Sequence, residues 1–83
     1  MEINDELRNM YEAKSEICYH LYEALRVDHK NLREINYVLE MRGNYYDEYV
    51  EVVLDGDGDN IVLKHNCYGD NSLGIMSEIL KLL

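Results

Sequence analysis

The sequence predicts an α+β protein in which a long N-terminal helix precedes a three-stranded antiparallel meander and a C-terminal helix. Three observations support this αβββα order: apolar residues at helical spacing near both ends, strict alternation between them, and glycine-containing turns that separate the alternating segments. The 83 residues fit a single domain, residues 1–83, and we expect both helices to cover one face of the sheet.

The first helix is expected to run from Ile3 to Leu25, because apolar residues there recur on one side at about 100° per residue. Lys14 falls near the centre of that apolar side. We expect its stem to lie along the core and its ammonium group to reach solvent at an edge. The opposite side carries a row of acids about 27 Å long at about 1.5 Å per residue. These acids are Asp5, Glu12, Glu16 and Glu23.

The chain then changes to the period of a strand. Residues 35–42 alternate between apolar and polar, and Gly43-Asn44 can form a two-residue hairpin turn. With that turn, the apolar sides of the two strands coincide. The predicted cross-strand pairs are Leu39 with Glu48, Tyr37 with Val50, and Ile35 with Val52.

A second hairpin is expected with Asp57 and Gly58 at the two central positions of a type I′ turn. This register puts an opposite-charge pair on one face and apolar pairs on the other. After Cys67, residues 68–72 supply turn and N-cap residues, and residues 73–83 have the spacing of a second amphipathic helix. The predicted cross-strand pairs are Leu54 with Ile61, Val52 with Leu63, and Glu51 with Lys64.

The charge balance restricts the function. Seventeen acidic residues against eight Lys and Arg give a formal charge of −9, which repels nucleic acid and anionic membranes. We therefore expect no direct binding to nucleic acid or to a membrane, and we expect a cytoplasmic protein, because the opening residues do not resemble a signal peptide. The electrostatic partners of such a chain are basic surfaces or cations.

The second hairpin offers one candidate cation site. Asp55, Asp57 and Asp59 match the first three ligand positions of a calcium-binding EF-hand loop. However, Asn60 stands where that loop needs glycine, and Asn66 stands where a glutamate should close the site. We therefore predict a hairpin tip, with a weak cation site as the alternative.

A zinc site is the second metal alternative. Cys18, His65 and Cys67 are suitable ligand types and could face one another, whereas His20 points away from Cys18 on a helix. Two buried thiols and a hydrogen-bonded histidine form the simpler interpretation. Since no motif for nucleophilic or metal-dependent catalysis is present, we expect a protein that is not an enzyme and that needs no cofactor.

The remaining candidate is the surface. From Glu40 to Asp59 the chain has seven acids against one base, Arg42, and acids alternate with tyrosines and valines on the second face of the sheet. We hypothesise that these carboxylates stand in for phosphates and block the basic site of a nucleic-acid-binding protein. The candidate partner-binding residues, besides the acids of the first helix, are Glu40, Tyr45, Asp47, Glu48, Tyr49, Glu51, Asp55, Asp57 and Asp59.

The alternative hypothesis is a regulatory or structural interaction domain. In that case the open sheet face, including Tyr49 and Val53, would bind a protein partner or form a homodimer. A contact driven by acids should weaken steeply with salt, whereas a buried sheet face should not.

In size, acidity and element order the chain resembles small acidic phage-encoded anti-CRISPR proteins of a helix, three-strand, helix type. The opening residues 2–5 and the strand start at residues 47–50 are similar as well. The first helix is longer than in that type, and only one helix follows the sheet. The resemblance implies a stoichiometric inhibitor of a CRISPR effector nuclease, active in the host cytoplasm, that competes with DNA for arginines and lysines.

Overall fold

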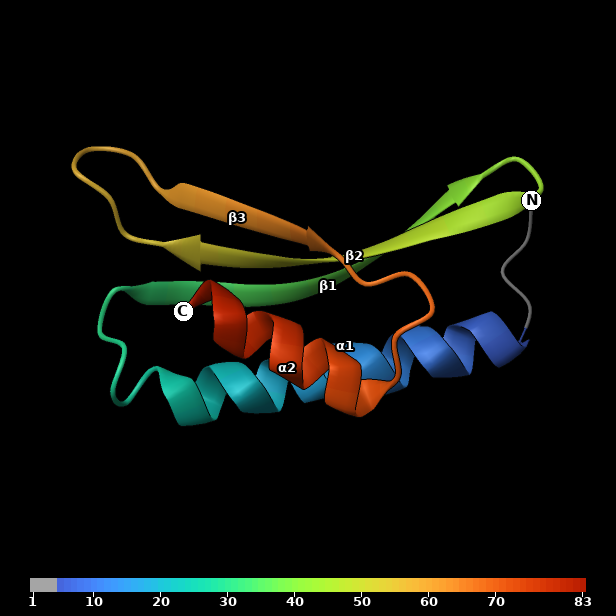
Figure 1. The fold of residues 1–83 in the computed structure, drawn as a ribbon, viewed down its shortest axis with the longest axis horizontal. Helices are drawn as coiled ribbons and strands as arrows, with labels where there is room; N and C mark the ends of the chain where they lie inside the picture. The colour runs from blue at the N-terminus through green and yellow to red at the C-terminus, as the bar shows by residue number, and fades with distance from the viewer. Residues whose placement is uncertain (1–4) are drawn as a thin grey trace.

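The computed structural model describes residues 5–83 and contains two helices and one sheet (Figure 1). The predicted start of the first helix at Ile3 lies outside the described residues. The elements follow the predicted order, so the αβββα architecture is confirmed. They are α1 (Asp5–Leu25), β1 (Leu32–Arg42), β2 (Tyr45–Leu54), β3 (Ile61–Asn66) and α2 (Ser72–Leu82).

The strands form one antiparallel sheet in the order β1-β2-β3, and both helices lie on the same face of it (Figure 1). The long helix α1 packs mainly under β1, and the shorter α2 packs against α1 and β2. The other face of the sheet carries no covering element among residues 5–83. This arrangement is the predicted one, with two helices on one side of an open sheet.

The core lies between the helices and the sheet. Val50 and Val52 of β2 and Ile75 and Ile79 of α2 have no exposed surface, which matches the apolar positions predicted for these elements. Asn71 begins α2 as its N-cap, and its side chain accepts a hydrogen bond from the Gly74 backbone N–H at 2.9 Å. The remaining members of the core cluster are Cys18, Leu32, Ile35, Tyr37 and Cys67.

The first hairpin has the predicted register, including the pair of Leu39 with Glu48. Gly43 has φ +65°, while Asn44 does not have a positive φ. A positive φ at the first central position only is the pattern of a type II′ turn, for which glycine is the usual residue. The predicted cross-strand pairs therefore form through this two-residue turn.

The second hairpin has the predicted pairs but not the predicted turn. Leu54 pairs with Ile61, and residues 55–60 form a wider loop in which Asp57 does not adopt the positive φ that a type I′ turn requires. Beyond Leu54, the Asp55 N–H donates to the carbonyl of Asn31 at 2.8 Å, so the first residue of the loop is still bonded toward the start of β1.

Candidate functional site

Glu48 was predicted on the binding surface, and the structure corrects this prediction. Its side chain is 1% exposed and accepts hydrogen bonds from Lys14 Nζ and from the Tyr37 hydroxyl, each at 2.6 Å. The Gly69 backbone N–H donates to its second carboxylate oxygen at 3.0 Å. The expected position of Lys14 is wrong as well, because its ammonium group turns into the core and not to an edge. Both errors have one physical cause, since each charge is the other's buried partner.

The electrostatics of this cluster favour the charged form of Glu48. Burial alone would raise the pKa of its carboxyl group, but the hydrogen bonds from Lys14, Tyr37 and Gly69 outweigh burial and hold the pKa below its ordinary value. Burial, followed by the hydrogen bond to Glu48, raises the pKa of Tyr37. The cluster is therefore a buried hydrogen-bonded network that joins α1, β1 and β2.

The open sheet face carries most of the other predicted residues of β1 and β2, and its acids are partly neutralised. Arg42 lies 2.9 Å from a carboxylate oxygen of Glu40 and 2.6 Å from one of Asp47. These groups are about half exposed, so the pairs contribute little stability. Their main effect is to cancel charge on this face. Tyr45, beside them, is 63% exposed.

The centre of the open face is also neutralised. Lys64 lies 3.8 Å from Glu51 and 5.2 Å from the ring centroid of Tyr49, close enough for a cation–π contact. Val53, expected to be available for a partner, is only 7% exposed, because its neighbours cover it. Val62, across from it on β3, remains 49% exposed.

The loop between β2 and β3 keeps two acids without a cationic partner. Arg33 pairs with Asp55 at 2.6 Å. Asp57 and Asp59 are exposed, and neither forms an ion pair within residues 5–83. Neither of the two alternative metal sets is brought together, since no group of three His, Cys, Asp or Glu in the described chain could hold a metal ion.

The residues of the zinc alternative have other roles. Burial raises the pKa of Cys18 to about 11 and that of Cys67 to about 12, so both are thiols near neutral pH. His65 points its Nε2 at a carboxylate oxygen of Glu78 on α2, at 2.7 Å. The structure therefore places them as two buried core thiols and a histidine paired across to α2.

The acidic row of α1 lies on the helix surface as predicted. Asp5 pairs weakly with Arg8 at 3.9 Å, and Glu23 pairs with Arg26 at 3.5 Å, so the two bases stand at the ends of the row. The middle of the acidic row carries more negative charge that no lysine or arginine within residues 5–83 neutralises. Glu12 forms no ion pair among the described residues, and the only partner of Glu16 there is His20, at 3.8 Å, which is a cation only when protonated.

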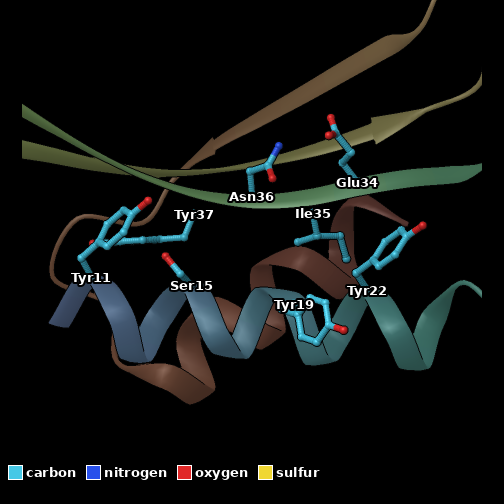
Figure 2. A pocket seen from close by; sticks show the side chains of 8 residues that line it. All are labelled: Tyr11, Ser15, Tyr19, Tyr22, Glu34, Ile35, Asn36 and Tyr37. Carbon is cyan, nitrogen blue, oxygen red and sulfur yellow. The ribbon is translucent and has the colours of Figure 1, made fainter. Parts of the chain in front are cut away.

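A groove of about 330 Å³, not foreseen from the sequence, separates α1 from the outer edge of β1 (Figure 2). Four tyrosines contribute to it, and the rings of Tyr11 and Tyr37 contact each other with centroids 5.8 Å apart. At about 100° per residue, the acidic row lies on the same flank of α1, just beyond Tyr19. The lining residues are Tyr11, Ser15, Tyr19, Tyr22, Glu34, Ile35, Asn36 and Tyr37.

The fold and these surfaces define a small α+β domain with an open sheet, an acidic helix flank and a tyrosine-lined groove. Comparison of the chain with known protein families, with curated protein sequences and with solved structures finds no match. Within residues 5–83, neither helix has the length and apolar character needed to cross a membrane.

Proposed function

We propose that this protein is a non-enzymatic inhibitor that binds the basic nucleic-acid-binding site of a partner protein. The observation that carries the proposal is the excess of acid at the surface. Glu2 lies outside the described residues, and Lys14 and Glu48 are buried together, which leaves 15 acidic side chains against seven Lys and Arg. The buried pair is neutral, so it removes nothing from this excess.

The distribution of the bases supports the same proposal. In the described part of the chain, each arginine or lysine at the surface except Lys30 already pairs with a carboxylate of this protein. Within residues 5–83, Lys30 is therefore the one surface base without such a partner, and no cluster of unpaired bases is present to attract nucleic acid. The acids with the fewest cations nearby are those in the middle of the α1 row, Glu12 and Glu16, and we assign the docking surface to this flank.

The test is a pull-down from candidate host lysate with the immobilised protein, at low and at high salt, with the retained proteins identified by mass spectrometry. We expect a basic nucleic-acid-binding protein to be retained at low salt and released by high salt or by added DNA. A CRISPR effector nuclease is the partner that the resemblance in sequence implies. Retention of no basic protein would reject the proposal.

A second candidate function is association through the open sheet face. It is favoured by the exposure of Tyr45 and Val62 on that face and by the mutual neutralisation of its charges, which lowers the repulsion between two copies. Sedimentation analysis at high salt separates the candidates. A dimer that persists there would support the sheet-face interface, because apolar contacts are not screened.

A further inference from the structure

The outer edge of β1 offers unpaired backbone groups. Arg42 and Tyr45 close a two-residue hairpin, so they form a hydrogen-bonded pair and the pattern alternates along β1. It follows that Ile35, Tyr37 and Leu39 direct their N–H and C=O groups away from β2. Since β1 is the first strand of the sheet, no strand within residues 5–83 pairs with these groups.

The groove beside this edge can receive side chains. It lies on the α1 side of β1, where Tyr11 is 44% exposed and Tyr19 is 58% exposed (Figure 2). The Oγ atom of Ser15 is buried at the groove and has no hydrogen-bond partner in the described structure. A strand added to β1 would therefore place every second side chain against tyrosine rings and beside an unsatisfied hydroxyl group.

The charges around the groove indicate which charge a segment bound there should carry. Glu34 and Asn36 point to the opposite side of β1 from the tyrosines (Figure 2). Glu34 is exposed and forms no ion pair in the described chain, and no lysine or arginine lines the groove. Glu12 and Glu16 flank it on the helix. An occupant with positive charge on alternate residues complements this pattern.

We propose that the edge of β1 binds an extended basic segment of the partner as a fourth strand. Small apolar or aromatic side chains of that segment enter the groove between β1 and α1. Its arginines or lysines lie on the other side, beside Glu34. The inference rests on the proposed function, since it specifies how the basic partner is held, and it adds backbone hydrogen bonding to electrostatic attraction.

The test uses a capped, fluorescently labelled heptapeptide that alternates arginine with valine, measured by fluorescence anisotropy at low salt. The matched peptide has the same sequence with N-methyl groups on alternate residues along one edge, which removes hydrogen-bond donors and keeps the charge. We expect the methylated peptide to bind at least about tenfold more weakly, because each lost hydrogen bond costs roughly a factor of five. Equal binding of the two peptides would overturn the inference and leave the proposed function standing.

Variants locate the bound peptide. Glu34→Gln should weaken binding about two- to fivefold, the effect expected for an exposed ion pair, and Tyr19→Ala should weaken it further by opening the groove. Tyr68→Ala is the matched control, since Tyr68 is similarly exposed but lies outside the groove. Equal losses for Tyr19→Ala and Tyr68→Ala would place the peptide elsewhere and reject the edge.

A second copy of this chain is the competing occupant. Pairing of two β1 edges would make a dimer in which the tyrosines of two α1 helices face each other. Sedimentation of the unmodified protein and of Tyr19→Arg decides this point. We expect both to be monomers with folded circular dichroism spectra. A dimer that Tyr19→Arg converts into a monomer would show the edge to be occupied by another copy and would overturn the proposal.

Discussion

The ammonium group of Lys14 lies 2.6 Å from a carboxylate oxygen of Glu48 inside the core of this domain. The two side chains are 11% and 1% exposed, and they come from positions 34 residues apart in the sequence. Tyr37 and Gly69 supply the further hydrogen bonds that a buried carboxylate requires. The pair joins α1 to β2, so its loss should lower the stability of the whole fold.

A double-mutant cycle tests this pair. Glu48→Gln leaves the Lys14 charge buried without a partner, and Lys14→Met does the same to Glu48, so each should cost about 3–5 kcal/mol of the free energy of unfolding. The double variant removes both charges, and the glutamine oxygen can accept from the Gly69 N–H while its NH2 group donates to the Tyr37 hydroxyl. We expect it to be more stable than either single variant in urea unfolding followed by circular dichroism. Additive losses would contradict a direct charge pair.

The same pair predicts a pH dependence. The pKa of Glu48 is lowered in the folded state relative to its ordinary value of 4.5, so the unfolded chain binds a proton at a higher pH than the folded chain does. Stability from Glu48 is therefore fully present above about pH 4.5 and is lost as the pH falls through the lower folded pKa.

The measurement is the free energy of unfolding at a series of pH values from about 7 to about 3. Other carboxylates also titrate in this range, so the informative quantity is the difference between the wild-type protein and Glu48→Gln. That difference should be constant near neutral pH and should shrink on acidification. A difference that stays constant down to the acid limit would show that Glu48 has no lowered pKa.

The fold could be predicted because its signals are local. Alternation in residues 35–42 and the Gly43-Asn44 turn determine one register, and a shift by one residue would have exposed the whole apolar face of β1. The sequence also held a signal for the buried pair. Lys14 falls in the apolar side of the helix, and Glu48 falls opposite Leu39 on the apolar face, so two opposite charges were left in the core.

The candidate site was less predictable. The acids of α1 follow from helical periodicity, but the neutralisation of Asp47 by Arg42 depends on how the side chains reach across the strands. The groove depends on where α1 crosses the edge of β1, which no local pattern encodes. The sequence therefore does not distinguish Tyr11, Tyr19 and Tyr22 from ordinary helix residues.

Gly69 provides a test of the network's geometry. It has φ +78°, and its N–H donates to Glu48. Gly69→Ala should cost about 1–2 kcal/mol from the left-handed conformation, with an additional loss as the N–H moves away from Glu48. Gly58→Ala is the matched control, because Gly58 has φ +93° and a Cβ at either position meets no atom within 4 Å. Thermal unfolding should show the larger loss for Gly69→Ala, and equal losses would mean that the hydrogen bond adds nothing.

The two thiols should resist modification in the folded protein. Cys18 and Cys67 are each 1% exposed, and burial raises the pKa of both. Iodoacetamide reacts with the thiolate, so we expect mass spectrometry to find no rapid adduct at about pH 8 under native conditions and two adducts in concentrated urea. The urea sample is the control for reagent activity. Rapid labelling of the native protein would show that the core opens readily.

The last prediction concerns which acids hold the partner. Glu12→Gln/Glu16→Gln and Asp57→Asn/Asp59→Asn remove the same amount of charge from exposed positions, the first pair on α1 and the second in the loop between β2 and β3. If the α1 flank is the docking surface, the first variant should bind the partner recovered by the pull-down about two- to tenfold more weakly at low salt, mostly through slower association. The loop variant should lose less, because only its long-range attraction is reduced. A larger loss for the loop variant would move the docking surface to the β2–β3 hairpin, and equal losses would mean that total charge alone, without a defined surface, attracts the partner.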